Sequence, residues 1–390
     1  MRENLHILLG GIPLGCDNIG DEAILACVVQ MMRKIVPLAR LAVATADAAT
    51  GAKLGVEVLP SYGFAGVSLD GFDEVVQDFD VYIWCGATGL SDYPNTALDL
   101  LEIAQRAGVR TFIWGVGMDD ELNPVFFRAS GKRRLLLRLF GAVEWYENRL
   151  RKSLGERLRA ILGRCEGIWL RDSQSVEMLR SFGVENMKVT ADPAIWLRPE
   201  EAPSVPSRRH TLGLCLSSQR PVKDTDGVRR FLDTMEKSGV RVLGIPMNPK
   251  TDAPMMQALG VCDIFSSVEP EAVAMQAAEC TLVLSSRLHL LIFAANVGTP
   301  LLGIARGSKL ANFLANFGQQ TEGSVTDCDW DALASKVLHL MDDPQLRTRF
   351  GERRARAYSA LESRFLHAQA EFAGKLTGEA VILPEEGKES

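Results

Sequence analysis

The side chains best suited to chemistry in this chain are Arg287 and His289, which lie in the segment TLVLSSRLHLLIFAANVGTPLLGIARGSK. The apolar run at 282–284 predicts a buried strand, and the apolar spacing at 288–296 predicts a buried helix. Both side chains therefore come at a strand-to-helix junction, where the hydroxyls of Ser285 and Ser286 are expected to cap the helix.

Open α/β sheets bind ligands beyond the carboxyl ends of their strands, and a helix N-terminus at that edge favours an anion. A guanidinium and a titratable imidazole at such a junction favour an anionic substrate and proton transfer. By spacing alone, an Arg paired with a carboxylate and a satisfied core His is the commoner meaning of these residue types.

Further candidate residues follow other predicted strands. Arg171 comes directly after a strand at 167–170, Arg220 follows a strand at 211–216, and Lys309 stands at the start of a helix. A glycine loop after the strand at 6–9 leads to a helix where an acid is well placed as a cap or in the first turn, and a second loop follows the strand at 81–85. The candidates in these two loops are Asn18, Gly20, Asp21, Glu22, Gly86 and Gly89.

Neither glycine loop matches GxGxxG or GK[ST], so a dinucleotide or P-loop site is weakly supported. A plain tight turn and a substrate-facing loop both remain open for the first loop. The eight cysteines form no CxxC pair and have no His at ligand spacing. We therefore expect no metal site and no disulfide framework.

Composition sets the broad class. A chain of 390 residues predicts two domains, and 47% apolar with 24% charged residues is ordinary for a globular protein. The 49 acids against 43 bases give no reason to expect nucleic-acid binding. No run of eighteen apolar residues and no signal-peptide layout is present, so a cytoplasmic protein is expected, with the inner face of the membrane as an alternative.

The alternation of strands and helices predicts parallel sheets with helices on both faces. We expect an N-terminal Rossmann-like domain at 1–198, a proline-containing linker at 199–209 and a C-terminal Rossmann-like domain at 210–343. Long charged helices at 344–377 and a disordered acidic tail at 378–390 complete the chain. Two such α/β domains facing across a cleft are the arrangement of GT-B glycosyltransferases.

Residues 132–164 are rich in Lys and Arg, interleaved with leucines at helical spacing. A solvated helical face is the usual meaning of such a run. The alternative is a patch that contacts anionic lipid headgroups or a diphosphate-linked acceptor.

Several motifs together resemble the polysaccharide pyruvyl transferase family, which includes the cell-surface-anchoring pyruvyl transferases. In order along the chain, they are Asn18-x-Gly20-Asp21-Glu22-Ala23, Arg171-Asp172-x-x-Ser175, Thr190-Ala191-Asp192-Pro193, Arg220-Pro221, Ser286-Arg287-Leu288-His289, Gly298-Thr299-Pro300 and Lys309.

The resemblance implies transfer of the carboxyethylidene group of phosphoenolpyruvate to two hydroxyls of a saccharide in cell-surface polysaccharide synthesis, without an organic cofactor. We expect Arg171, Arg220, Arg287 and Lys309 to bind the carboxylate and phosphate of this co-substrate. The C-terminal half is the expected donor side and the N-terminal half the expected acceptor side, with a lipid-linked acceptor as an alternative. His289 would act as the acid, and Asp21 or Glu22 as the base. A nucleotide-sugar-dependent GT-B glycosyltransferase and a non-catalytic saccharide-binding relative remain alternatives.

Overall fold

The computed structural model describes residues 4–120, 122–199 and 210–378, which divide into two compact units. Unit 1 comprises Met1–Cys16, Val28–Asp192 and Ser363–Ser390, and unit 2 comprises Asp17–Cys27 and Pro193–Glu362. The start of the first helix thus groups with unit 2. Except for residues 199 and 378, the expected linker and tail lie outside the described residues.

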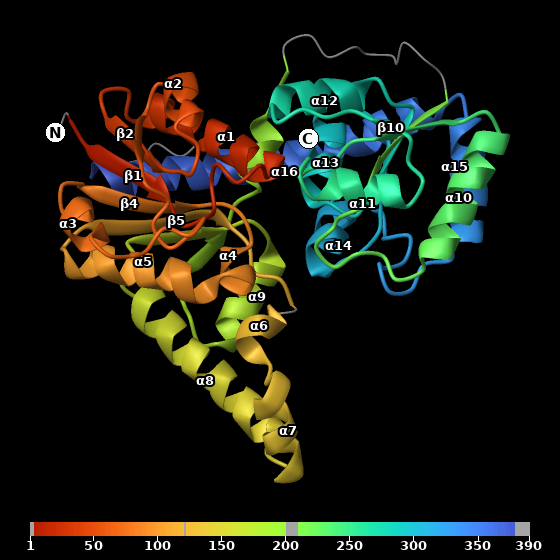
Figure 1. Cartoon of the computed structure of the whole chain (residues 1–390). Coiled ribbons are helices and arrows are strands. Elements are labelled where there is room, and N and C mark those ends of the chain that lie inside the picture. Colours follow the sequence, from red (N-terminus) through yellow and green to blue (C-terminus); the bar gives the residue numbers. More distant parts are fainter. Residues whose placement is uncertain (1–3, 121, 200–209, 379–390) are drawn as a thin grey trace. The chain divides into compact units, whose positions relative to one another are not determined.

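Unit 1 contains a seven-stranded parallel sheet with the order β3-β2-β1-β4-β5-β6-β7 (Figure 1). The strand order reverses between β1 and β4, and all five residues of the central β4 are buried, as a strand covered on both faces requires. The strands are β1 (His6–Gly10), β2 (Arg40–Ala44), β3 (Glu57–Leu59), β4 (Val81–Cys85), β5 (Arg110–Val116), β6 (Gly167–Leu170) and β7 (Met187–Val189).

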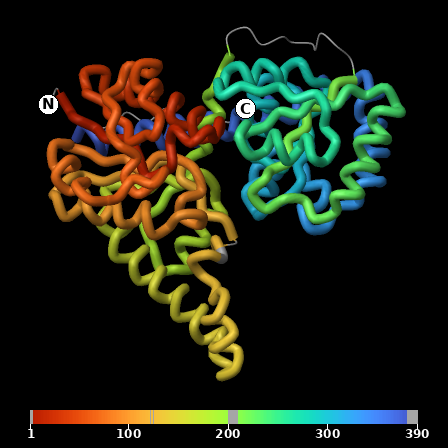
Figure 2. The backbone as a smooth tube through the Cα atoms, viewed as in Figure 1, coloured from red at the N-terminus to blue at the C-terminus, as the bar shows by residue number. Residues whose placement is uncertain are grey.

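The helices up to residue 181 are α1 (Ile19–Ile35), α2 (Ala49–Leu54), α3 (Phe72–Val76), α4 (Gly89–Asp92), α5 (Pro94–Arg106), α6 (Pro124–Phe127), α7 (Gly131–Leu139), α8 (Val143–Leu162) and α9 (Ser173–Ser181). The long C-terminal helix α16 (Leu346–Thr377) returns to this unit, as the tube in Figure 2 shows. Its Phe372 packs against Trp114 of β5 and Trp169 of β6, with ring centroids 5.2 and 5.4 Å away. Its last part therefore completes the core of unit 1.

Unit 2 contains a five-stranded parallel sheet with the order β10-β9-β8-β11-β12, which reverses between β8 and β11. The strands are β8 (Thr211–Cys215), β9 (Arg241–Gly244), β10 (Asp263–Ile264), β11 (Leu282–Ser285) and β12 (Leu301–Gly303). The helices are η1 (Pro193–Trp196), α10 (Thr225–Lys237), α11 (Asp252–Ala258), α12 (Pro270–Ala278), α13 (Leu288–Asn296), α14 (Ser308–Ala315), α15 (Trp330–Met341) and the first part of α16.

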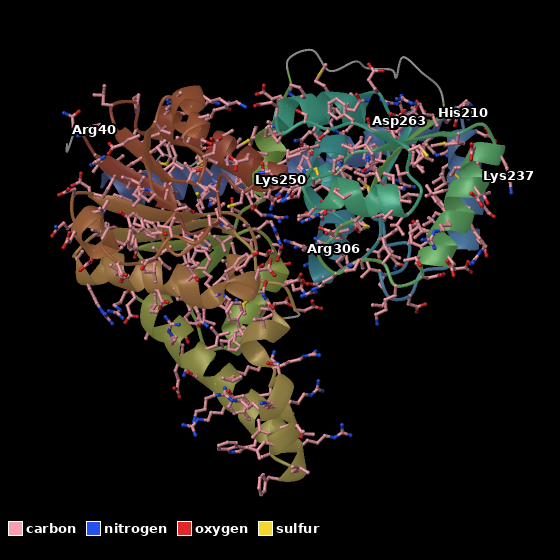
Figure 3. All side chains as sticks on the ribbon, viewed as in Figure 1. Arg40, His210, Lys237, Lys250, Asp263 and Arg306 are labelled. Carbon is pink, nitrogen blue, oxygen red and sulfur yellow. The ribbon has the colours of Figure 1, made fainter. Side chains whose placement is uncertain are left out.

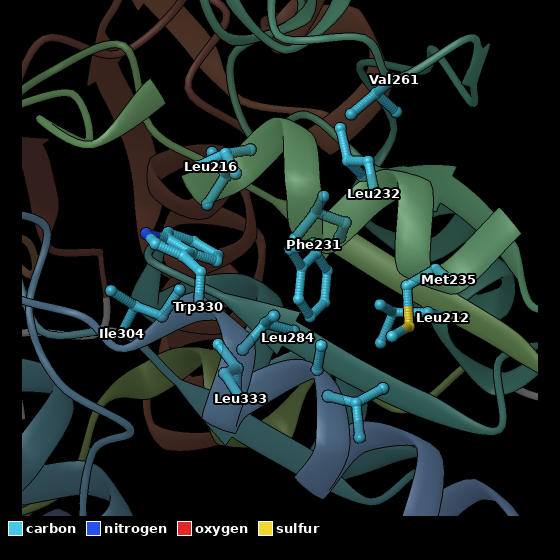
Figure 4. Packing of buried hydrophobic residues seen from close by; sticks show 14 of the residues in the cluster. Leu212, Leu216, Phe231, Leu232, Met235, Val261, Leu284, Ile304, Trp330 and Leu333 are labelled. Atoms are coloured by element: carbon cyan, nitrogen blue, oxygen red, sulfur yellow. The ribbon is translucent and has the colours of Figure 1, made fainter. Parts of the chain in front are cut away.

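The core of unit 2 joins β8 and β11 to helices α10 and α15 (Figure 4). Phe231 of α10 and Trp330 of α15 meet edge to face at 5.6 Å, beside Leu212 and Leu284 of the sheet. Polar residues such as Lys237 and Asp263 lie exposed at the surface (Figure 3). The core thus fixes β8 and β11 side by side, and with them the segments that follow each strand.

The segment around Arg287 has largely the predicted elements. Helix α13 runs over 288–296 as expected, and the preceding strand extends one residue further, to Ser285. The predicted serine cap is wrong, because the N-cap residue is Arg287 and no side chain caps the helix. Instead, Ser285 Oγ bonds the backbone N–H and C=O of Arg287, and Ser286 Oγ accepts from Ser217 N.

Candidate active site

The candidate site lies in unit 2 at the carboxyl ends of β8 and β11, where the strand order reverses. A reversal of this kind is the usual ligand position in open α/β sheets, because the connections on its two sides leave the sheet toward opposite faces. Two of the predicted cations lie in the segments that follow these strands, Arg220 after β8 and Arg287 after β11. Unit 2 thus brings both to one edge of its sheet.

Arg287 is held by a buried carboxylate that the sequence analysis missed. Its Nε and Nη2 atoms donate to the Oδ2 and Oδ1 atoms of Asp252 at 3.0 and 2.7 Å. Asp252 is fully buried and also accepts from the backbone N–H groups of Ser218 and Asn248. A bidentate pair fixes the plane of a guanidinium, so Asp252 orients Arg287. The feature of the sequence that could have indicated this contact is the position of Asp252, an acidic residue shortly after the end of β9.

Arg306 is a second residue that the sequence analysis passed over. Its guanidinium donates to Ser286 O at 2.6 Å, to Ser217 Oγ at 2.9 Å and to Gln219 O at 2.8 Å, which ties together the segments after β8 and β11. Arg220 in turn donates to Arg306 O at 2.8 Å, from a left-handed backbone with φ of 54°. Strained backbone at a non-glycine residue is frequent at functional sites. Arg306 is labelled in Figure 3.

One residue of helix α13 is not buried. Eight of its nine residues are buried, and His289, in the first turn, is the half-buried exception. The helix is therefore a core element whose one accessible side chain is an imidazole. Gly20 of α1 approaches this ring so closely that a Cβ atom there would lie 2.0 Å from His289 Nδ1.

The neighbouring carboxyl group belongs to Asp21, in the first turn of α1 as predicted, and it is 4% exposed. Burial raises its pKa to about 6, although His289, a hydrogen bond from Asn18, Lys309 and Arg287 all lower it. Asn18 Nδ2 donates to Asp21 Oδ2 at 2.6 Å. A buried carboxyl that titrates near neutrality beside an imidazole is a pair suited to proton transfer.

Unit 2 therefore contains most of the predicted site: Asn18, Gly20, Asp21, Glu22, Arg220, Arg287, His289 and Lys309. Glu22 is half-buried next to Asp21, and Lys309 is the second residue of α14. The first loop was assigned to the acceptor side in the N-terminal half, but its residues 17–27 group with unit 2.

Three predicted residues lie in unit 1. Arg171 is 7% exposed, donates to Asp172 Oδ2 at 3.2 Å and lies 3.6 Å from Asp192 Oδ2. Burial opposes the charged form of Arg171, but these carboxylates outweigh it and raise the pKa of the guanidinium. Gly86 has a φ of 75°, and a Cβ at Gly89 would lie 2.6 Å from the Trp84 ring. Conformation and packing thus account for both glycines.

Within the described residues, no group of three or more His, Cys, Asp or Glu side chains is arranged to hold a metal ion.

Comparison with known proteins identifies the family. A family model for polysaccharide pyruvyl transferase matches residues 18–308, from the Asn18 loop to the start of α14. The chain belongs to the polysaccharide pyruvyl transferase family. This membership makes it a transferase, and every unit 2 candidate except Lys309 lies inside the matched region.

Several solved structures have a fold similar to that of this chain. S. aureus MnaA in complex with UDP has 13% identity and a TM-score of 0.60, covering 97% of this chain and 99% of its own. Anabaena HepE in complex with UDP and glucose has 16% identity, a TM-score of 0.58 and coverage of 96% and 99%. The glycotransferase of kitacinnamycin has 12% identity, a TM-score of 0.58 and the same coverage.

At such identities the likeness shows the fold alone, and the predicted α/β fold with Rossmann-like units of GT-B type is confirmed. No curated protein matches the chain in sequence.

Proposed function

We propose that this transferase moves the carboxyethylidene group of phosphoenolpyruvate onto two hydroxyls of a saccharide and releases phosphate. The observation that carries the proposal is the convergence of cations with the Asp21–His289 pair at the carboxyl edge of the unit 2 sheet. We further propose that the reaction uses no organic cofactor, and that it serves cell-surface polysaccharide synthesis in the cytoplasm.

The cations suit a donor that has a carboxylate and a phosphate on a three-carbon skeleton. A guanidinium has five N–H donors, and Asp252 engages Arg287 through two of its nitrogens. Arg220 follows β8 and donates to the backbone carbonyl of Arg306, which follows β12, and Lys309 is close enough to Asp21 to lower the pKa of its carboxyl. We assign these four cations to the two anionic groups of phosphoenolpyruvate, with Lys309 on the leaving phosphate.

Proton transfer falls to the pair at the N-termini of α1 and α13. His289 donates a proton to the methylene carbon of phosphoenolpyruvate, which becomes a methyl group and leaves C2 electrophilic. One saccharide hydroxyl attacks C2 and gives its proton to Asp21. The C2–O bond to phosphate then breaks and phosphate leaves, and the second hydroxyl attacks C2 and gives its proton to His289 as the ketal closes, which restores the protonated imidazole. Glu22 is the alternative base.

The acceptor assignment draws on unit 1. Gly86 and Gly89 follow β4, beside the point where the strand order of unit 1 reverses, which is where an α/β sheet accommodates a ligand. We propose that a saccharide, free or lipid-linked, binds there. Arg171 stays a predicted ligand of phosphoenolpyruvate.

The test is phosphate release from phosphoenolpyruvate with a panel of hexose and N-acetylhexosamine acceptors, with the ketal identified by mass spectrometry. We expect release that requires an acceptor, and a rise in melting temperature with phosphoenolpyruvate, because a ligand that binds only the native state stabilises it. Arg306→Gln should diminish both. The matched control is Arg229→Gln, an exposed arginine of α10 paired with Asp226, which should change neither.

A nucleotide-sugar-dependent glycosyltransferase is the second candidate, because MnaA and HepE, which share the fold, are each in complex with UDP. It predicts stabilisation by UDP or GDP and none by phosphoenolpyruvate. A non-catalytic relative would bind saccharide without releasing phosphate. Either result would reject pyruvyl transfer.

A further inference from the structure

Helix α7 has an unusual surface, because none of its residues is buried although four are leucines. Six of the eleven large apolar side chains that are exposed in the described residues lie between positions 125 and 145. They are Val125 (78% exposed), Leu135 (64%), Leu136 (57%), Leu139 (75%), Phe140 (78%) and Trp145 (61%). Residues four apart share a helix face, so Leu135 pairs with Leu139 and Leu136 pairs with Phe140. The two pairs lie side by side and form one apolar stripe.

The hairpin formed by α7 and the first half of α8 is held in place from within unit 1. Arg133 of α7 donates to Tyr146 Oη of α8 at 2.8 Å and covers the tyrosine ring, and Ala129 N donates to Glu147 Oε1. From Leu154 onward α8 has buried residues. Figures 1 and 2 show the hairpin extending beyond the sheet of unit 1, and Figure 3 shows side chains standing out along it.

The charge of the hairpin is opposite to that of the chain. Residues 125–152 contain eight Lys or Arg against two Glu, an excess of six positive charges, whereas the whole chain has a formal net charge of −6. Arg128 precedes α7, four cations lie on α7 together with the apolar stripe (Lys132, Arg133, Arg134 and Arg138), and three lie on α8 (Arg149, Arg151 and Lys152). A solvated face accounts for the cations but not for the leucines and Phe140.

We propose that this hairpin docks unit 1 onto an anionic lipid bilayer. The apolar stripe on α7 enters the boundary between headgroups and acyl chains, and the flanking Arg and Lys side chains contact lipid phosphates. Trp145 suits this depth, because its ring is apolar and its N–H is polar. The docking segment is 125–152 rather than the 132–164 expected from sequence, because much of the last part of α8 is buried. The proposal is independent of pyruvyl transfer.

The test is co-sedimentation of the full chain with vesicles of phosphatidylglycerol and phosphatidylcholine, compared with pure phosphatidylcholine, at low and physiological salt. We expect binding to the anionic vesicles that weakens with salt. The pair Arg134→Gln and Arg138→Gln should weaken binding by on the order of tenfold, and the pair Leu139→Ser and Phe140→Ser should weaken it at both salt concentrations. None of these side chains is buried, so the melting temperature should stay unchanged.

Matched controls are available in both units. Leu38→Ser replaces an exposed leucine of unit 1 outside the hairpin, and Arg229→Gln replaces an exposed arginine of unit 2, so neither should alter binding. Failure to co-sediment with anionic vesicles at low salt would overturn the proposal. So would binding that is unaffected by the Leu139 and Phe140 changes, or that heparin reproduces equally well, since these outcomes indicate a polyanion site rather than a bilayer site.

Discussion

Two junctions in this chain have the same sequence pattern, a strand, then an arginine, then a helix, yet they differ in what surrounds the arginine. Arg171 follows β6 and Arg287 follows β11, and each is 7% exposed and paired with a carboxylate. At the first junction, Asp172 both pairs with Arg171 and caps α9 by accepting from Ser175 N at 2.8 Å. At the second, no side chain caps α13.

The cap decides which junction is suited to an anion. A helix N-terminus presents unsatisfied N–H groups and partial positive charge. At α9 the carboxylate of Asp172 takes up both, and Asp192 adds a further negative charge. At α13 the carboxylate partner of Arg287 comes from α11, and the first helical turn holds His289 instead. Arg171 thus lies in a compensated core pair, whereas Arg287 adjoins a titratable group.

The largest effect is expected from removing His289, the imidazole that the Arg171 junction lacks. His289→Ala should lower kcat by on the order of a hundred- to ten-thousand-fold, because the proton donor to the methylene carbon is removed. The melting temperature should stay close to that of the wild type. Stopped assays of phosphate release measure the rate, and His339→Gln, an exposed histidine of α15, is the control. A near-normal rate in His289→Ala would exclude the imidazole from the reaction.

The two arginine variants should differ in donor binding rather than in stability. Arg171→Gln leaves Asp172 and the buried Asp192 uncompensated and should cost about 3–5 kcal/mol of unfolding free energy, while the thermal shift with phosphoenolpyruvate persists. Arg287→Gln leaves the buried Asp252 uncompensated and should also lower stability, but in addition it should weaken phosphoenolpyruvate binding by about tenfold to a hundredfold, because a charge-assisted hydrogen bond is lost. Thermal melts with and without phosphoenolpyruvate measure both.

Arg229→Gln is the control for both arginine variants. Loss of the donor shift in Arg171→Gln would break the comparison and make Arg171 a donor ligand, as the sequence predicts.

A third test moves the imidazole without removing it. The methyl group introduced by Gly20→Ala would lie 2.0 Å from the present position of His289 Nδ1, so the imidazole ring must shift. Alanine has a higher helix propensity than glycine, so the fold should persist. A displacement of about 1 Å can cost on the order of a hundredfold in rate.

A double-mutant cycle isolates this contact. On the His289→Ala background, Gly20→Ala should cause no further loss, because the colliding ring is gone. Additive losses would show that Gly20 acts through something other than His289.

Local patterns in the sequence predicted most of the elements and the two junctions. The span of α13 and the edge positions of Arg220 and Arg287 follow from apolar periodicity and strand order. The partner of Arg287 could not be predicted, because Asp252 is 35 residues away and reaches it only through the folded sheet. The Asp21–His289 proximity is likewise long-range, and only the folded chain groups residues 17–27 with unit 2. Asp172, by contrast, stands beside Arg171 in the sequence and was a readable signal of a capped helix.

The smallest expected change in stability tests the electrostatic state of the Arg287 junction through Asp21. Because burial raises the pKa of this carboxyl from 3.8 to about 6, the folded state binds its proton more tightly than the unfolded state does. Stability should therefore fall as pH rises between about 4 and 6 and stay lower above that range. Asp21→Asn should be more stable than the wild type at pH 7 by between about 1 and 3 kcal/mol, and equal to it below pH 4.

The same variant should lose the acidic limb of the rate profile near pH 6, since the base is gone. Urea titrations and rate profiles from pH 4 to 8 measure the two effects, with Asp17→Asn, a carboxylate paired with Lys250, as the control. Equal stability of Asp21→Asn and wild type at pH 7 would mean that the cations around α13 already compensate this carboxylate, and the two junctions would then differ in geometry alone.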